Sequence, residues 1–130
     1  MKPARLAAIA LLACAACPSS VLAQDAAADA ERGRRVYRVC LPCHVPDADT
    51  NKQGPHLKGV FGRRAGAVEG FRYSQAMIDA GAAGLAWDEN SLADFLASPK
   101  RKVPGTSMRF WGLWSQSDID AVIEYLKTNP

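Results

Sequence analysis

The side chains best suited to chemistry in this sequence are two cysteines and a histidine within five consecutive residues. Cys40-Leu41-Pro42-Cys43-His44 follows the Cys-x-x-Cys-His pattern of covalent haem attachment. Each thiol would add to one of two neighbouring vinyl groups of the porphyrin, which requires sulfurs about one helical turn apart. The histidine directly after the second cysteine would then lie beneath the iron and supply an axial nitrogen. The pattern therefore predicts one covalently bound haem c, attached through Cys40 and Cys43 and ligated by His44.

Three other chemistries use the same residue types, and the surrounding sequence disfavours each. A thioredoxin-like redox pair needs a strand before the motif within a βαβ unit, and no strand-like run precedes Cys40. A tetrahedral zinc site needs four ligands, and the adjacent Cys43 and His44 would share one metal ion awkwardly. A structural disulfide between Cys40 and Cys43 would leave His44 without a role.

A c-type haem has either a second protein ligand or an open sixth site, and two methionines are candidates for the ligand. Met77 lies in a short helical stretch, where a methionine usually fills space in the core. Met108 ends a segment, from Pro99 onward, whose two prolines and glycine predict an irregular loop. A methionine on such a loop can present its sulfur to the iron. An open site would instead indicate a peroxidase, or a gas or redox sensor.

Hydrophobic spacing predicts an all-α domain with three main helices and long loops. The first helix is expected from about Asp29 to Val39, and the middle one from Asp88 to Ala97 with Asp88 as its cap. Ser117, with Asp120 three residues later, predicts the cap of the last helix. No segment alternates convincingly like a strand. The stretch 45–72 is rich in glycine, proline and polar residues, and such a long loop is understandable if it packs on a bound haem.

One glycine and one alanine-rich segment carry further expectations for the first helix. Gly33 costs a helix about 1 kcal/mol relative to alanine, so we expect a second helix, the last in the chain, to approach closely there. The alanine-rich stretch 25–30 is expected to be a frayed start.

Residues 1–23 are interpreted as a secretory signal peptide, which leaves 24–130 as one domain. Two basic residues precede the apolar run 6–17, and Val21-Leu22-Ala23 offers small or compact residues for cleavage. The run is shorter than the roughly 20 residues that span a bilayer, and no later run is longer, so no membrane anchor is expected. Two alternatives remain: a buried helix, and lipid attachment at Cys14. A signal peptide places the protein in a bacterial periplasm or an equivalent compartment.

Removal of the signal peptide would change the charge and the cysteine count. Loss of Lys2 and Arg5 lowers the basic residues from 16 to 14 against 13 acidic ones, a net charge of about +1. That balance is not the footprint of a protein that binds nucleic acid. Cys14 and Cys17 leave as well, so only the two cysteines of the haem motif remain.

Several segments together resemble class I cytochrome c of the mitochondrial-type branch, which includes soluble bacterial relatives with one haem. The resemblance runs from about Glu31 to Lys127, nearly the whole chain after the signal. The segments that carry it are Cys40-Leu41-Pro42-Cys43-His44, Gly54-Pro55-His56-Leu57-Lys58-Gly59-Val60-Phe61-Gly62-Arg63, Gly70-Phe71-Arg72-Tyr73, Trp87, and Pro104-Gly105-Thr106-Ser107-Met108.

The resemblance implies the cytochrome c fold, in which the first and last helices cross and Tyr37 meets Tyr125. It implies that Met108 is the sixth iron ligand and that the Pro55 carbonyl accepts a hydrogen bond from the ring of His44. It also implies further haem contacts, among them three positions that hold a buried haem propionate. These residues are Arg63, Tyr73 and Trp87 for the propionate, together with Thr106.

The activity implied by the resemblance is one-electron transfer between redox partner proteins, a donor and an acceptor. Both iron ligands would stay bound in the ferric and ferrous states, and no catalytic residue is expected because the protein would not be an enzyme. We expect a monomer. Relatives steer acidic partners with lysines around the haem edge. Here Lys100, Arg101 and Lys102 are present, but Val39 and Ser107 stand where relatives often carry lysine.

The chain also departs from the family pattern. Phe95 stands where the family usually has a tyrosine and Met77 where it often has an asparagine, so we expect a drier ligand pocket. Trp111 and Trp114 are expected to be core or partly buried cover, with a flatter, less charged docking face as the alternative. His56 is expected on a surface loop.

Overall fold

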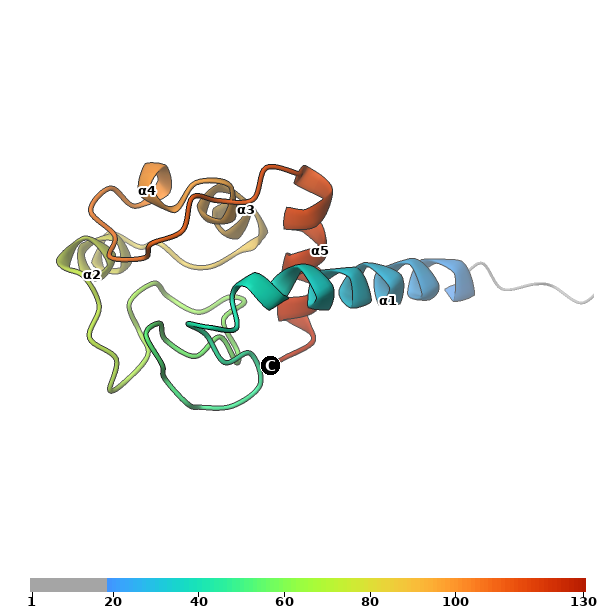
Figure 1. Cartoon of the computed structure of the whole chain (residues 1–130), viewed down its shortest axis with the longest axis horizontal. Coiled ribbons are helices and arrows are strands. Elements are labelled where there is room, and N and C mark those ends of the chain that lie inside the picture. The colour runs from blue at the N-terminus through green and yellow to red at the C-terminus, as the bar shows by residue number, and fades with distance from the viewer. Residues whose placement is uncertain (1–18) are drawn as a thin grey trace, which may run out of the picture.

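The structure, a computed structural model, describes residues 19–130, and its regular elements there are helices apart from one isolated bridge between Arg64 and Ala86. Figure 1 shows their arrangement around a set of long connections. The all-α prediction is confirmed. In chain order the elements are α1 (Ser19–Val36), the 3₁₀ turn η1 (Tyr37–Val39), α2 (Gln75–Ala82), α3 (Glu89–Ala97), α4 (Pro99–Lys102) and α5 (Gln116–Lys127).

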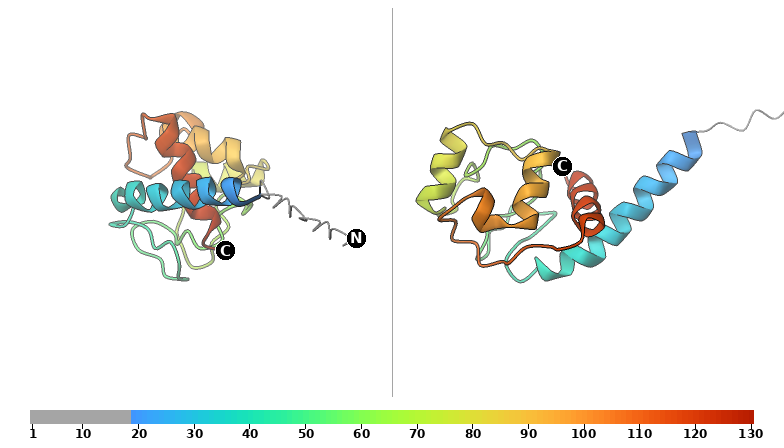
Figure 2. Two further views of the ribbon diagram at one scale, coloured as in Figure 1. Left: turned by 90° about the vertical axis from the view of Figure 1, so that its right-hand side faces the viewer. Right: turned by 90° about the horizontal axis from the view of Figure 1, so that it is seen from above.

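Helices α1 and α5, from opposite ends of the chain, cross and pack against each other (Figures 1 and 2). Gly33 lies against the backbone of Ala121, so close that an added Cβ would lie 2.5 Å from the Ala121 carbonyl carbon. One turn further along, the rings of Tyr37 and Tyr125 lie 5.2 Å apart between centroids. At the edge of the contact, Arg32 forms a 2.8 Å ion pair with Asp118. The predicted helix crossing, with glycine at the closest approach, is confirmed.

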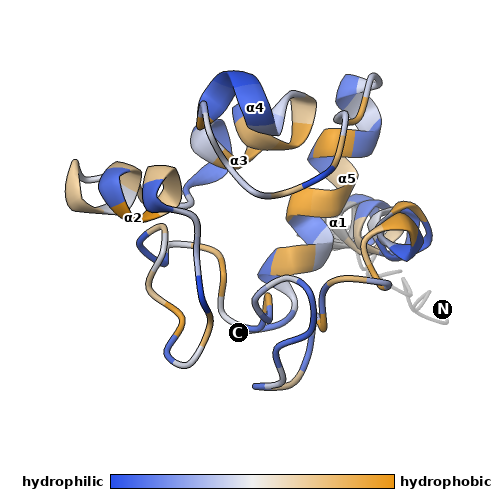
Figure 3. Ribbon diagram, turned by 60° about the vertical axis from the view of Figure 1, so that its left-hand side comes forward, coloured by the Kyte–Doolittle hydropathy of each residue, from blue (hydrophilic) through white to orange (hydrophobic). Residues whose placement is uncertain are grey.

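The core lies between α5, α3 and the inner surfaces of the loops. Helix α5 supplies most of its aliphatic surface, seen as hydrophobic bands along that helix in Figure 3. Helix α3 adds Leu92, Phe95 and Leu96, the inward residues of its periodic pattern. The apolar face of each helix is therefore buried against a partner, which supplies most of the stability of such short helices. The fully or nearly fully buried residues of α5 are Ile119, Ala121, Val122, Ile123 and Leu126.

Helix α1 begins ten residues earlier than predicted, at Ser19 instead of Asp29. The expectation of a frayed start over 25–30 is wrong, because alanine has the highest helix propensity and continues the helix without tertiary contacts. This part of α1 extends away from the other elements (Figure 2), and Asp25 and Asp29 are exposed. Most of the predicted signal peptide, with Cys14 and Cys17, lies outside the described residues.

Two helices begin at polar caps. The Asp88 carboxylate accepts a 2.8 Å hydrogen bond from the Ser91 amide, which lowers the pKa of Asp88 and confirms the predicted cap of α3. Ser74 caps α2 by accepting a hydrogen bond from the Met77 amide at 3.3 Å. After α3, the segment expected to be wholly irregular forms the short helix α4, which begins at Pro99, the position where a missing amide costs a helix nothing.

The predicted cap of α5 is wrong. Helix α5 starts at Gln116, and the residue before it is Ser115, whose side chain makes no capping bond. Ser117 lies inside the first turn, where its hydroxyl accepts a 2.9 Å hydrogen bond from Arg32 of α1. None of the helices between residues 19 and 130 is both long and apolar enough to cross a membrane.

Replacing Gly33 with alanine tests the close packing of α1 on α5. The added Cβ would overlap backbone atoms of Ala121, which cannot rotate away, so we expect Gly33→Ala to lower the free energy of unfolding by about 1–3 kcal/mol. Helix propensity alone would favour alanine by about 1 kcal/mol, so the two effects have opposite signs. Denaturant unfolding of the haem-loaded protein measures the change. Arg34→Ala, on the exposed side of the same helix, is the control and should change stability by about 0.5 kcal/mol or less; a more stable Gly33→Ala would contradict the packing argument.

Candidate functional site

A cavity of about 360 Å³ lies between the loop after η1, the loop before α5, and helices α3 and α5. Its volume is in the range of small-molecule and cofactor sites, and its walls are mainly apolar with a few polar groups. Every residue predicted from the sequence to bind or ligate the cofactor lines this one cavity. These residues are Cys40, Cys43, His44, Pro55, Arg63, Tyr73, Trp87, Thr106 and Met108.

The two cysteines lie on one wall, on a single helical turn that continues from η1. The amides of Cys43 and His44 both donate to the Cys40 carbonyl, at 3.0 and 2.9 Å. Both thiols are free and half-buried. Burial, with a smaller contribution from Cys43, raises the pKa of the Cys40 thiol to about 11, which is the opposite of the lowered pKa of a thioredoxin-like pair. Cys40 therefore does not match the attacking cysteine of a thiol–disulfide exchange pair.

The ring of His44 is held in one orientation beneath the same wall. Its Nδ1 donates to the Pro55 carbonyl at 2.7 Å, which leaves Nε2 available as a ligand, and only 8% of the residue is exposed. Burial lowers the pKa of His44 and favours the neutral imidazole that a metal binds. Gly54 backs the ring: an added Cβ would lie 2.7 Å from Nδ1. The Gly54 amide donates to the Cys43 carbonyl at 2.9 Å, so the two segments are tied together directly beside the ring.

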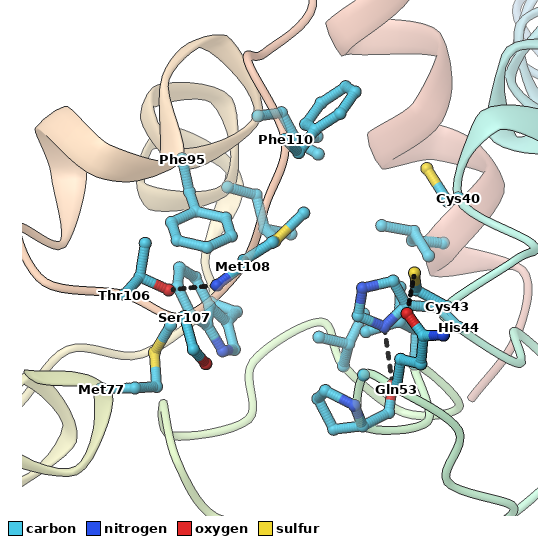
Figure 4. Close-up of a pocket in the computed structure, with 18 of the residues that line it drawn as sticks. Cys40, Cys43, His44, Gln53, Met77, Phe95, Thr106, Ser107, Met108 and Phe110 are labelled. Atoms are coloured by element: carbon cyan, nitrogen blue, oxygen red, sulfur yellow. Dashed lines mark hydrogen bonds between the residues drawn. The ribbon is translucent and has the colours of Figure 1, made fainter. Parts of the chain in front are cut away.

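Met108 lies on the opposite side of the cavity. Figure 4 shows its side chain and the ring of His44 facing the same space from opposite walls. The Thr106 amide donates to the Val103 carbonyl at 3.0 Å, and the Met108 amide approaches the Thr106 hydroxyl oxygen at 3.3 Å. These hydrogen bonds stabilise a turn of the loop that directs the Met108 side chain into the cavity. Phe95 and Met77 line the same wall, and both are buried.

A third part of the cavity carries the polar groups expected for an anion. The Arg63 guanidinium donates to the carbonyls of Lys58 and His56, both at 2.9 Å, and none of the ion pairs among the described residues includes it. Tyr73 accepts a 3.3 Å bond from the Val68 amide, so its own hydroxyl proton is free to be donated. A half-buried guanidinium without a carboxylate partner suits an anionic group that enters the cavity.

Trp87 closes this part of the cavity and is 7% exposed. Its ring packs on Phe95 with centroids 4.9 Å apart. Packing on Phe95 is sufficient to explain the burial of Trp87. Trp87 also lines the cavity together with Arg63 and Tyr73.

The residues present fit a covalently attached haem. The same apolar space is surrounded by four kinds of group. These are two free thiols one helical turn apart, an imidazole whose Nδ1 is already hydrogen-bonded, a thioether that faces it, and a guanidinium without an ion-pair partner. Within residues 19–130, no group of three or more histidine, cysteine, aspartate or glutamate side chains could hold a metal ion, so the zinc alternative has no site there.

Comparison with known proteins decides between the remaining classes. The family model described as "Cytochrome c" matches residues 30–130. The chain belongs to the cytochrome c family. Cytochrome c2 of Afifella marina is 48% identical over 97 residues, which cover 74% of this chain and 78% of that protein. Cytochrome c2 iso-2 of Magnetospirillum molischianum is 46% identical over 101 residues, covering 78% and 98% of the two chains. The solved structure of cytochrome cH from Methylobacterium extorquens, 42% identical, superimposes with a TM-score of 0.71 over 77% of this chain and 98% of that one.

Membership of the cytochrome c family confirms the resemblance, the fold and the cofactor. The protein carries a covalently bound c-type haem with its iron, and it is an electron carrier rather than an enzyme. An electron carrier has redox partners by definition. The individual roles assigned to its residues remain predictions, which the cavity geometry makes specific.

The structure corrects one expectation about side chains and adds one residue to the site. Trp111 and Trp114, expected to be at least partly buried, are 89% and 95% exposed. His56 lies on a loop, as expected, and is half-buried there, with its amide donating to the Asn51 side chain and its carbonyl accepting from Arg63. Gly54 was not recognised as part of the site, although a glycine that directly precedes Pro55 was a signal for close approach of another group.

Replacing Gly54 with alanine tests whether the glycine sets the orientation of His44. The new Cβ would overlap the imidazole ring, so we expect Gly54→Ala to weaken the His44–Pro55 hydrogen bond and to lower the free energy of unfolding by about 1–3 kcal/mol. Thermal unfolding and the optical spectrum of the haem-loaded variant measure both effects. Gln53→Ala, an exposed neighbour whose side chain contacts Cys43, is the control; equal stability and spectra in both variants would show that Gly54 does not position the ring.

Proposed function

We propose that this cytochrome is a periplasmic one-electron carrier in which Cys40 and Cys43 bind the haem as thioethers and His44 and Met108 ligate its iron. The observation that carries the proposal is the facing arrangement of His44 and Met108 across one apolar cavity, with both free thiols on the histidine side. When bound, the haem supplies an iron that alternates between the ferric and ferrous states.

The chain itself has to keep the iron environment similar in both states. The Pro55 carbonyl holds the His44 ring in one orientation and one tautomer. Two local hydrogen bonds, from the Thr106 amide to the Val103 carbonyl and from the Met108 amide to the Thr106 hydroxyl, fix the loop that presents Met108. A pre-formed, buried site of this kind needs little rearrangement when the charge on the iron changes.

We propose that Arg63, Tyr73 and Trp87 hold a buried haem propionate, with Thr106 as a further haem contact. Arg63 supplies a positive charge whose carbonyl bonds already fix its position, and Tyr73 supplies a free hydroxyl proton. A carboxylate taken out of water needs both kinds of partner. The apolar Phe95 and Met77 on the ligand side support a dry pocket there.

Location and processing belong to the same proposal. We propose that residues 1–23 are removed on secretion and that the mature chain is a monomer. In support of cleavage, Asp25 and Asp29 are exposed, and the contacts of α1 with α5 described above involve Arg32, Gly33 and Tyr37, so loss of residues 1–23 would remove none of them. Intact mass of the mature protein should correspond to a start at Gln24; a lipid-modified Cys14 would contradict this.

Carbon monoxide binding to the reduced protein tests the proposed ligation by Met108. We expect the wild type to show a low-spin spectrum with the weak red sulfur-to-iron band and no change on addition of carbon monoxide. Met108→Ala should lose the red band and bind carbon monoxide readily, because a bound sixth ligand is what excludes it. Met77→Leu, which replaces the other methionine on that wall, is the control and should behave as wild type. Ready binding of carbon monoxide by the wild type would contradict the proposal.

A further inference from the structure

We propose that Trp111 and Trp114 form the apolar centre of a docking surface for a redox partner protein whose own face carries carboxylates around an apolar depression. The inference rests on the proposed function, because it concerns the partner to which this carrier passes its electron. The proposal gives a role to two large hydrophobic side chains that the fold leaves exposed to solvent.

The two indole rings are the most exposed large hydrophobic side chains of the described chain, at 89% and 95%. Aromatic side chains of this size bury about 150–250 Å² each when they are covered. Tryptophan and arginine are also the residues most enriched in the energetically dominant parts of protein interfaces. Two exposed tryptophans, three residues apart in the sequence, therefore point to a partner that covers them.

The exposure is imposed by an anchored backbone and does not follow from a loose loop. Gly112, between the two tryptophans, adopts a positive φ of 113° and lies on the end of α3, where an added Cβ would be 2.7 Å from the Ala97 carbonyl carbon. The next residue, Leu113, donates its amide to the Leu96 carbonyl at 2.8 Å and packs against the core. With the middle of the segment fixed inward, the flanking side chains of Trp111 and Trp114 project outward. A rigid presentation of this kind lowers the entropy lost on docking.

The segment that carries the pair borders the place where the haem cavity opens to solvent. The cavity wall includes four residues that are themselves exposed, and these mark its mouth: Val39, Gln53, Ser107 and Arg109. Trp111 follows Arg109 by two residues, on the segment that also carries Met108. A partner that covers the two rings is therefore brought to the opening of the haem cavity.

The charges around the mouth indicate the chemistry of the partner. Residues 32–46 and 98–117 contain eight arginine and lysine residues and no acidic residue. Arg38, Lys100, Arg101 and Arg109 take part in none of the ion pairs among the described residues. The Lys100 amine lies 5.8 Å from the centroid of the Trp111 ring, so the apolar and cationic parts of the surface are adjacent. A complementary face has carboxylates outside an apolar centre.

The same observations disfavour the other possible occupants. A second copy of the chain would place the unpaired cations of one molecule against those of the other. A lipid surface accepts no electron and would leave unexplained why the two rings stand on the segment that borders the mouth of the haem cavity.

The experiment compares Trp111→Ala/Trp114→Ala with wild type as haem-loaded, reduced proteins oxidised by the membrane and soluble fractions of the cells that make the protein. Phe61→Ala, which removes a 40% exposed aromatic ring that does not line the cavity, is the matched control. We expect the double variant to show a KM at least about tenfold higher, because loss of interface anchors of this type typically exceeds that change. Its kcat, optical spectrum and resistance to carbon monoxide should equal those of wild type. The difference in KM should persist at high ionic strength, because salt screens charges and not apolar contacts.

Several outcomes would overturn the proposal. A KM equal to those of wild type and Phe61→Ala would remove the docking role while leaving the carrier function intact. Sedimentation of wild type, but not of the double variant, with protein-free phosphatidylglycerol–phosphatidylcholine vesicles would identify a membrane as the occupant. A wild-type dimer that the double substitution dissociates would identify a second copy. Failure of both fractions to oxidise the wild type would refute the carrier function itself, and the docking proposal with it.

Discussion

The fold depends on filling one apolar cavity. The cavity, of about 360 Å³, is lined mainly by apolar side chains, and filling it removes their surface from water. The long connections of the chain have little regular structure with which to bury their own apolar residues, and they turn those residues toward the cavity instead. In this protein the c-type haem is therefore a part of the core, and its covalent attachment keeps it there.

The contact between α1 and α5 determines how the two walls of the site face each other. The cysteine and histidine wall follows directly from the end of α1, whereas the methionine wall is the segment that leads into α5. Because Gly33 lets the two helices touch at the backbone, the segments attached to their ends are held at a fixed separation. Local bonds then refine each wall: the Pro55 carbonyl orients His44, and the turn at Thr106 directs Met108. Ligand geometry in this site is thus a consequence of helix packing some distance away from the cavity.

The sequence predicted best what depends on local chemistry. The spacing of Cys40, Cys43 and His44 predicted the haem that family membership confirms, and the cap at Asp88 and the small residue at Gly33 each reflect a single local requirement. The sequence did not predict features that depend on contacts with distant parts of the chain, or on the lack of such contacts. Ser117 has the right type and spacing for a cap, but its hydroxyl accepts from Arg32 of another helix. The alanine-rich start of α1 had no tertiary partner to predict, and its intrinsic propensity alone extends the helix.

The exposure of the two tryptophans is another feature that is decided by the rest of the molecule and that residue types do not predict. Hydrophobicity predicts that Trp111 and Trp114 are covered by their own chain, and their exposure follows from the positive φ of Gly112 and the tie of Leu113 to α3, neither of which can be read from residue types. A side chain that its own fold leaves uncovered, on a segment that borders a redox site, is better understood from what the protein has to meet than from what it has to bury.

The most direct test of the account is a crystal structure of the mature, haem-loaded protein, with the iron located by its anomalous scattering. We expect one iron between His44 Nε2 and the Met108 sulfur, at bonding distance from both, in a porphyrin bonded to the sulfurs of Cys40 and Cys43. Coordination of the iron by Met77 or His56, or an iron with no protein ligand opposite His44, would contradict it.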